Sequence, residues 1–408
     1  MSEPAGAGNR IVAGSFEGTW RDLAALEAPE ASAFFVGSNI DALRAVWIHA
    51  THPGRETLVA AHSRKEAGLV EGLRVAGLAT VDVDGDSVAV DPLPDPRPAT
   101  PGRVWLLTSG STGRPKHVAH TLESLTTVKG AQPPRTWLCP YTPGAYAWWQ
   151  VTTLGLELAD QAVVYVENDR LDDWAEIALE HGVDAASGTP TFWRQALMRS
   201  GDTLARIPFQ QVTLGGEPVD QAVLDLLHEA FPSARVSWIY ASSEAGASIA
   251  VHDGKAGFPE KWLGSEPREG RPRLSIDGDE LVIASPHRGE GVDAELHTGD
   301  RVEIRDGRVL ITGRLASDEI NVGGSKVSAS QVRETLLAHP GVAWANVKGR
   351  KAPLVGTVVT AEVVLADPAT TEADLARWCA ERLADYAVPR RFRVRDSIPI
   401  KESLKSDV

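Results

Sequence analysis

Between residues 162 and 240, short apolar runs alternate with amphipathic stretches that repeat about every 3.6 residues. The apolar runs predict strands at 162–166, 183–186, 211–214 and 235–240, and the amphipathic stretches predict helices at 172–180, 191–198 and 219–230. Because a helix separates each pair of strands, every connection can cross over and return parallel. This part of the chain therefore predicts an α/β fold with mainly parallel sheets sandwiched by helices.

After about residue 270 the apolar period shortens to about two residues. The stretches 274–283 and 302–311 each place an Asp-Gly pair, Asp277-Gly278 and Asp306-Gly307, between alternating runs. Asp-Gly favours the tight turns of β-hairpins. The pattern predicts a β-hairpin-rich subdomain that completes a large N-terminal domain, residues 1–314.

Beyond Arg314 the pattern of apolar and polar positions changes again. Helices are predicted at 329–338 and 372–383, and strands at 342–347, 358–364 and 392–394. About 90 residues can fold on their own. We therefore expect a small α+β C-terminal domain at 315–408.

The first 103 residues carry weaker signals. A helix at 40–49 and a strand at 57–60 stand out, followed by a Pro-rich stretch at 92–101 that is typical of a linker. A strand at 104–107 leads into a Gly/Ser/Thr loop, and a helical pattern begins at about Thr121.

Composition excludes several classes of protein. The 408 residues carry a formal charge of −14, so the overall field repels nucleic acid and anionic membranes. No stretch approaches the ~18 consecutive apolar residues of a membrane span. The two cysteines and the N-terminus without a basic and apolar leader favour a cytoplasmic, unexported protein.

The loop after the strand at 104–107 reads TSGSTGRPK at 108–116. Glycines let backbone N–H groups and hydroxyls approach phosphate oxygens, and a lysine adds a point charge. The P-loop of nucleoside triphosphatases is excluded by spacing, since Pro115 stands where that motif needs glycine. A solvated Ser/Gly turn is the alternative for this loop taken alone.

The loop resembles the phosphate-binding loop of the adenylate-forming superfamily, which includes acyl- and aryl-CoA synthetases, nonribosomal adenylation domains and luciferase. Further motifs of that family follow in the same order: GTPTF at 188–192, GGEP at 215–218, YASSE at 240–244, ELHTGD at 295–300, GR at 313–314 with SDEINVGGSKV at 317–327, and IPIKESLK at 398–405. One such motif is weak, but several in order are specific.

The resemblance implies an ATP site. The residues expected at the β- and γ-phosphates are Thr108, Ser109, Gly110, Ser111, Thr112 and Gly113. Lys116 is expected to anchor this loop or to face a phosphate. Glu244 is expected to hold Mg²⁺, because a hard cation that bridges phosphates prefers one or two carboxylates. Ser243 is expected to touch the α-phosphate.

The resemblance also implies which residues bind the nucleoside and which lysine supplies the positive charge for catalysis. Asp300 would accept hydrogen bonds from the ribose, Arg314 would reach the ribose or a phosphate, and Lys405 would stabilise the charge that develops during adenylation. The expected adenine neighbours are Gly215, Gly216 and Glu217, with Tyr240 stacking on the ring and Ala241 and Ser242 beside it. Taken singly, an Asp after Thr-Gly is usually a turn residue, and a lysine near a terminus is usually solvated.

The chain departs from the family's pattern in places. Leu404 stands where glycine is usual and Ile400 where a lysine often stands, so Lys401 competes with Lys405 for the catalytic role. An additional residue after Arg314 leaves the hinge position open. About 107 residues precede the loop, fewer than the resemblance implies, so 1–103 is expected to be a shortened subdomain.

An aromatic cluster follows residue 140. Tyr141, Tyr146, Trp148 and Trp149 could line a pocket for a flat ring, with Gly188 and Thr189 beside it. A helix that packs its tryptophans into the core is the alternative. The cluster favours an aromatic acid as substrate.

The resemblance implies an ATP- and Mg²⁺-dependent ligase that converts a small acid to acyl-AMP with release of pyrophosphate. The acyl group would then pass to a thiol of CoA or of a phosphopantetheinyl carrier protein, after the C-terminal domain rotates about the hinge. Transfer to an amine, activation of nitrite to diazotise an aryl amine, and a non-catalytic nucleotide-binding relative are the alternatives. The sequence leaves open whether the chain forms a homodimer.

Overall fold

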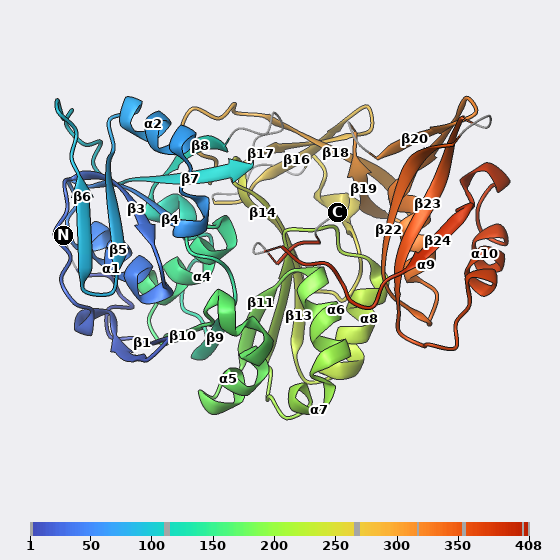
Figure 1. Cartoon of the computed structure of the whole chain (residues 1–408), viewed down its shortest axis with the longest axis horizontal. Helices are drawn as coiled ribbons and strands as arrows, with labels where there is room; N and C mark the ends of the chain where they lie inside the picture. Colours follow the sequence, from blue (N-terminus) through green and yellow to red (C-terminus); the bar gives the residue numbers. More distant parts are fainter. Residues whose placement is uncertain are drawn as a thin grey trace.

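The computed structural model describes residues 3–109, 115–264, 270–315, 318–352, 356–401 and 404–406; for Ser109, Pro115 and Lys116 it describes the backbone alone. Figure 1 shows the N-terminal residues at one end of the molecule, the strands of residues 185–251 near the centre and the elements of residues 319–394 at the other end, while the end of the chain, marked C, returns to the centre.

An eight-stranded sheet forms the centre, in the order β14-β13-β12-β11-β9-β10-β1-β2. Its strands are β1 Arg10–Ala13, β2 Phe16–Thr19, β9 Arg135–Cys139, β10 Gln161–Tyr165, β11 Ala185–Gly188, β12 Gln211–Gly215, β13 Arg235–Ser242 and β14 Gly246–Val251. The pairs from β1 through β13 are parallel, and the edge strands β2 and β14 are antiparallel. The predicted parallel sheet is confirmed.

Crossover helices connect these strands. They are α4 Tyr146–Glu157, α5 Trp174–Glu180, α6 Pro190–Arg199, α7 Gly201–Leu204 and α8 Gln221–Ala230. The predicted helices at 191–198 and 219–230 correspond to α6 and α8, and α5 forms the later part of the one predicted at 172–180.

The N-terminal residues build a six-stranded sheet in the order β6-β5-β3-β4-β7-β8. Its strands are β3 Ala31–Val36, β4 Glu56–Ala61, β5 Ala79–Asp84, β6 Ser87–Asp91, β7 Arg103–Ser109 and β8 Pro115–His120, with helices α1 Asn39–Thr51 and α2 Ala67–Val75. Strands β7 and β8, which stand before and after residues 110–114 in the sequence, pair antiparallel. The helix expected from Thr121 is only the short α3, Leu122–Leu125.

The stretch at 92–101, predicted as a linker, is tied to this sheet. Glu56 is fully buried and accepts hydrogen bonds from both terminal nitrogens of Arg97, at 2.7 and 2.8 Å, and from the Thr100 amide at 2.7 Å. The Trp105 indole donates to the same carboxylate at 2.7 Å. The stretch is therefore a fixed part of the fold, because one buried charge requires these partners.

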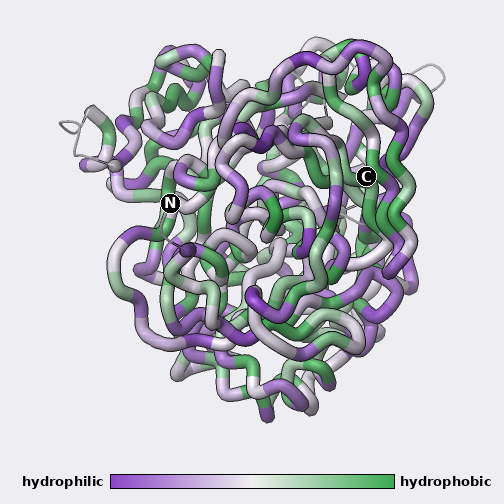
Figure 2. Tube along the Cα trace, turned by 90° about the vertical axis from the view of Figure 1, so that its left-hand side faces the viewer, coloured by the Kyte–Doolittle hydropathy of each residue, from purple (hydrophilic) through white to green (hydrophobic). Residues whose placement is uncertain are grey.

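The two sheets share one core. Side chains of α1 and α4 join residues from both sheets in a single apolar cluster. Trp148 of α4 donates its indole N–H to Asn39 of α1 at 2.9 Å, which connects the helices. Figure 2 shows hydrophobic stretches alternating with hydrophilic ones along the tube, as expected for elements that bury one face.

A five-stranded antiparallel sheet follows, in the order β15-β19-β18-β17-β16. Its strands are β15 Phe258–Pro259, β16 Arg273–Asp277, β17 Glu280–Ala284, β18 Leu296–Arg305 and β19 Arg308–Arg314. Both predicted hairpins are confirmed, with Asp277-Gly278 and Asp306-Gly307 at their turns.

The C-terminal residues have a core of their own. It is built from β20 Glu319–Val322, β21 Ser325–Ser328, α9 Ala329–Leu337, β22 Val342–Ala352, β23 Gly356–Leu365, α10 Glu372–Ala380 and β24 Arg391–Val394. β23 pairs antiparallel with β22 and parallel with β24. None of the described helices is long and apolar enough to cross a membrane.

Candidate active site

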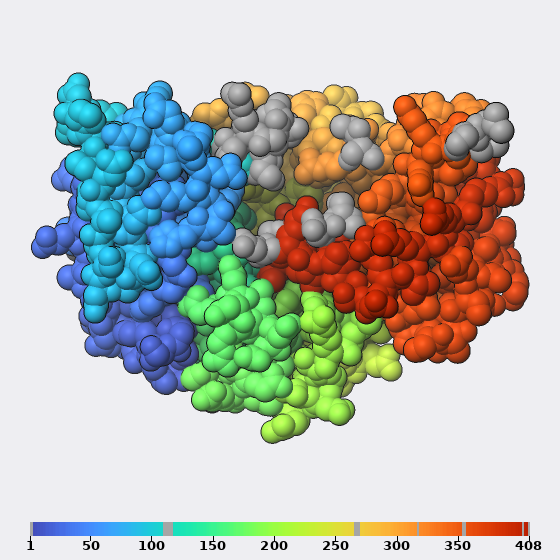
Figure 3. Space-filling view, in the orientation of Figure 1, coloured from blue at the N-terminus to red at the C-terminus, as the bar shows by residue number. Residues whose placement is uncertain are grey.

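A cavity of about 2390 Å³ lies where the strand ends, the hairpin sheet and the C-terminal segment meet. Figure 3 shows this segment, in red, lying across the middle of the molecule above the green helices of the central sheet. The segment brings Lys405 to residues more than 150 positions earlier in the chain.

The carboxyl ends of β11, β12 and β13 supply one wall of the cavity. Thr189 follows β11, residues 215–217 follow or end β12, and residues 240–244 end and follow β13. Parallel strands place their carboxyl ends at one edge of a sheet, which is where α/β folds bind ligands. The three motifs that the sequence separates are thereby brought together.

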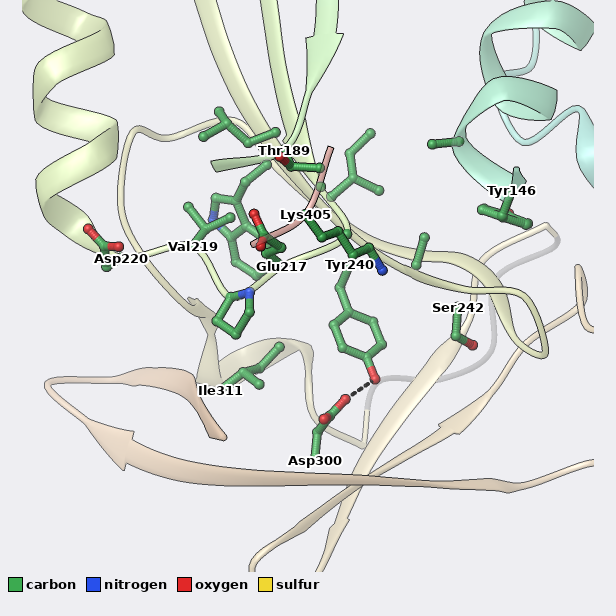
Figure 4. Close-up of a pocket in the computed structure, with 18 of the residues that line it drawn as sticks. Tyr146, Thr189, Glu217, Val219, Asp220, Tyr240, Ser242, Asp300, Ile311 and Lys405 are labelled. Carbon is green, nitrogen blue, oxygen red and sulfur yellow. Dashed lines mark hydrogen bonds between the residues drawn. The ribbon is translucent and has the colours of Figure 1, made fainter. Parts of the chain in front are cut away.

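Tyr240, Asp300 and Arg314 form a connected cluster, shown in part in Figure 4. The Tyr240 hydroxyl donates to Oδ2 of Asp300 at 2.5 Å, and Nε of Arg314 lies 2.9 Å from Oδ1. Burial raises the pKa of Asp300, against the opposing effects of Tyr240 and Arg314. Burial also raises the pKa of Tyr240, so its hydroxyl stays protonated and donates.

The turn after β13 presents Ser243 and Glu244 to the cavity. Ser242 Oγ accepts from the Ala245 amide at 2.9 Å, which closes the turn. The His120 Nε2–H donates to the Ser243 carbonyl at 2.7 Å. Because burial lowers the pKa of His120, this contact is a neutral one that fixes the backbone next to Glu244.

The residues fit a cation held together with phosphates better than a cation held by protein alone. In the described part of the chain no three His, Cys, Asp or Glu side chains gather closely enough to hold a metal ion. Glu244 is the carboxylate that the turn after β13 presents to the cavity. Mg²⁺ is commonly bound through one or two carboxylates while substrate phosphates and water complete its shell.

Lys405 reaches into the cavity between Glu217 and Tyr240, as Figure 4 shows. Burial lowers the pKa of Lys405, Glu217 opposes that shift, and the charges of Arg314 and Lys401 reinforce it. Lys401 also lines the cavity. The geometry therefore places both candidate lysines at the site.

Only some residues of the predicted phosphate-binding loop lie within the part of the chain that the structure describes. Thr108 lines the cavity. Its backbone pairs with that of Lys116, whose side chain lies outside the described set, as does that of Ser109. Gly110, Ser111, Thr112 and Gly113 also lie outside the described residues.

The aromatic cluster divides between cavity and core. Tyr141 and Tyr146 line the cavity, and the Tyr141 hydroxyl shares a hydrogen bond of 3.0 Å with Ser187. The pocket prediction was wrong for Trp148 and Trp149, which are fully buried in the core. One helical residue turns the side chain by about 100°, so Trp148 and Trp149 lie about 200° and 300° round α4 from Tyr146, outside the arc of Ala147, Gln150 and Val151 that lines the cavity.

Sequence reasoning missed other residues of the α4 wall. They are Ala147, Gln150, Val151 and Leu154, and Trp137 of the neighbouring β9 also lines the cavity. Tyr146, Gln150 and Leu154 repeat every four residues, which is the signal that could have identified them. Gly188 does not line the cavity, because Phe192 and Trp193 pack against it.

Comparisons with known proteins agree with this architecture. The family model described as AMP-binding enzyme matches residues 24–313, and the model of its C-terminal domain matches residues 331–405. A fatty acid–[acyl-carrier-protein] ligase, ScoC of Streptomyces coeruleorubidus, is 26% identical over 386 residues, which cover 83% of this chain and 73% of that protein.

Other matches are local or structural. A 2-succinylbenzoate–CoA ligase of Bacillus velezensis is 33% identical over 150 residues, and the match spans only 31% of that protein. The crystal structure of the anthranilate CoA ligase AuaEII in complex with anthranoyl-AMP superimposes with a TM-score of 0.73 at 15% identity, over 98% of this chain and 92% of that one. The chain therefore belongs to the AMP-binding enzyme family and has the fold of the adenylate-forming superfamily.

Proposed function

We propose that the chain is an ATP- and Mg²⁺-dependent ligase that activates a small aromatic carboxylic acid as acyl-AMP and passes the acyl group to a thiol. The supporting observation is the convergence of Lys405, Glu244 and the Asp300–Arg314 pair on one cavity. A cation, a single carboxylate and a ribose acceptor are the groups that adenylation needs.

In the first half-reaction, a carboxylate oxygen of the acid attacks the α-phosphorus, and the bond to the β-phosphate breaks with pyrophosphate leaving. Both reactants are anions, so Lys405 stabilises the negative charge that they bring together. Asp300 accepts hydrogen bonds from the ribose, and Tyr240 supports the adenine. Ser243 is placed to contact the α-phosphate.

Mg²⁺ would be held by Glu244 and by the phosphates, and it would neutralise charge on the leaving pyrophosphate. The His120 contact fixes the backbone next to Glu244, which keeps that carboxylate directed at the cavity.

In the second half-reaction, a thiol sulfur attacks the acyl carbon and AMP leaves. We place a domain boundary between Arg314 and Leu315, so that the part at 315–408 rotates and exchanges Lys405 for the strand near Gly323 and Gly324. Such a rotation is a hinge movement. The thiol belongs to CoA or to a phosphopantetheinyl carrier protein.

The wall on α4 supports an aromatic acid with no second charge. Among the described residues that α4, β9 and β11 contribute to the cavity, none is charged. Tyr141 and Tyr146 offer flat apolar surfaces that favour a ring. A second carboxylate or an ammonium group in the substrate would be left without a partner at this wall.

The experiment is ATP-dependent pyrophosphate exchange by the purified chain with Mg²⁺, against separate pools of aryl acids, fatty acids and amino acids, with nitrite alone in a further well. We expect exchange with aryl acids. Exchange confined to another pool would contradict the acid class, and ATP binding without exchange in any pool would contradict the enzyme.

A further inference from the structure

The Glu217 side chain connects two segments that are far apart in the sequence. Its Oε2 accepts from the Thr191 amide at 3.1 Å, and its Oε1 accepts from the Ser406 amide at 2.8 Å. Thr191 lies in the first turn of α6, and Ser406 directly follows Lys405. One carboxylate therefore spans the large N-terminal part of the chain and the residue after Lys405.

The segment around Lys405 needs such contacts. Leu404 has a φ of +60°, and its side chain is buried at 2% exposure. A residue with a Cβ is strained in this region of backbone conformation, so surrounding contacts must hold it there. The Thr189 hydroxyl donates to the Leu404 carbonyl, and Lys401 closes the turn by donating its amide to the Lys405 carbonyl at 2.8 Å.

The contacts lie on both sides of Lys405. Thr189 holds the residue before it, and Glu217 holds the residue after it. The Lys405 side chain passes over Gly216, where an added Cβ would lie 3.3 Å from its Cε. Gly216 thus packs against the lysine side chain, and Glu217 binds the backbone of the residue that follows the lysine.

We propose that Glu217 is a positioning residue, which holds the Lys405 ammonium group at the reacting phosphate by fixing the backbone on its C-terminal side. The inference rests on the proposed function, in which Lys405 serves adenylation. The sequence analysis expects Glu217 beside the adenine, whereas this inference gives its carboxylate the role of holding the segment around Lys405. Because Ser406 must leave Glu217 when the C-terminal part rotates, the same contact opposes release of the adenylation arrangement.

The test measures the reactivity of Lys405 in the full chain without substrates. The probe is acetic anhydride at pH 8, with acetylation of Lys405 measured by mass spectrometry against the exposed Lys326. Glu217→Asp keeps the charge but is one methylene too short to reach both amides. Glu217→Gln keeps the length but loses the charge. Glu229→Gln, an exposed position on α8, is the matched control.

We expect acetylation of Lys405 to increase roughly five-fold in both Glu217 variants, since release of the segment moves the Lys405 amine away from the cavity wall that limits the approach of the reagent. Glu229→Gln should match the wild type. Wild-type labelling of Lys405 in Glu217→Asp would overturn the proposal. Thermal melts of the variants, compared with the wild type, show whether the fold is retained, and increased labelling in a variant with a wild-type melt supports the local role.

A kinetic readout separates this inference from the proposed function. With benzoate as the acid, Glu217→Asp should lower kcat for pyrophosphate exchange roughly ten-fold, with the KM for ATP unchanged. A raised KM with unchanged kcat would place Glu217 at the nucleotide and overturn the inference. If the wild type does not turn over benzoate, the labelling result still decides the role of Glu217, because it needs no turnover.

Discussion

Arg314 and Asp300 form an ion pair across the hairpin of β18 and β19, with Nε of Arg314 2.9 Å from Oδ1 of Asp300. Arg314 is the last residue of β19, and it also donates to the Thr298 carbonyl at 2.9 Å. The carboxylate that we propose to bind the ribose therefore also holds Arg314, the last residue before the proposed domain boundary. A change at Asp300 is expected to affect both.

Asp300→Asn should raise the Kd for ATP roughly ten-fold, which corresponds to about 1.4 kcal/mol. The substitution removes the charge that accepts from the ribose and pairs with Arg314. Equilibrium binding of ATP measures the effect. Asp277→Asn, at an exposed hairpin turn, should bind ATP as the wild type does. An unchanged Kd in Asp300→Asn would contradict the ribose role.

As pH rises, the rate of adenylation should fall when Lys405 loses its proton. This fall should occur at a lower pH than the pKa of an ordinary lysine predicts. Burial lowers the pKa of Lys405 from 10.5, so its proton is lost earlier as pH rises. Lys401→Met removes a neighbouring like charge and should move this limb to higher pH. The pH profile of pyrophosphate exchange checks the shift. Complete loss of exchange in Lys401→Met would instead make Lys401 the catalytic lysine.

Tyr146 and Trp148 occupy opposite faces of α4 and should respond differently. Tyr146→Ala should raise the KM for an aryl acid roughly ten-fold, because it removes a wall of the cavity. Trp148→Phe should lower the free energy of unfolding by about 1 to 3 kcal/mol and leave acid preference unchanged. Acid kinetics and urea unfolding separate them, and a change of acid preference in Trp148→Phe would argue against the assignment of that side chain to the core.

Glu56→Gln should lower the free energy of unfolding by about 3 kcal/mol, since it leaves Arg97 without its buried partner. Burial acts to raise the pKa of Glu56, but the hydrogen bonds from Arg97, Thr100 and Trp105 outweigh it, so the pKa is lowered. A lowered pKa stabilises the fold above the unfolded value near 4.5, and this contribution is lost as pH falls through the folded value.

Urea unfolding at pH 7 and pH 4 tests this prediction. Glu71→Gln, at an exposed position on α2, is the control and should match the wild type. The difference between Glu56→Gln and the wild type should be smaller at pH 4. Equal stability of the two at pH 7 would show that the network contributes nothing.

Much of the central fold is predictable from the sequence because apolar strand segments alternate there with amphipathic helices. The strands that become β10 to β13, and the helices α6 and α8, each bury one face or both, and that leaves a clear pattern. Strands β1 and β2 have four residues each, and β1 pairs with β10, which lies about 150 positions later. Strand β11 is as short, but it lies between two predicted helices; no predicted helix flanks β1 or β2, so these two strands depend on tertiary contacts that leave little local signal.

The site is predictable to the extent that its motifs resemble those of a family. Glu244, Asp300 and Lys405 line one cavity, and the roles expected from their motifs stay predictions. The link from Glu217 to Ser406 could not be predicted, because it depends on how the last residues fold back over the central sheet. The burial of Trp148 and Trp149 depends on which face of α4 meets the core.

The most direct test of the central claim is a comparison of the two half-reactions in the wild type and in Lys405→Ala. Formation of acyl-AMP from ATP and benzoate should fall at least about hundred-fold in the variant, while ATP binding and thioester formation from supplied benzoyl-AMP and CoA stay near wild type. Unchanged formation of acyl-AMP in Lys405→Ala would contradict the account, because the lysine held in the cavity would then have no part in adenylation.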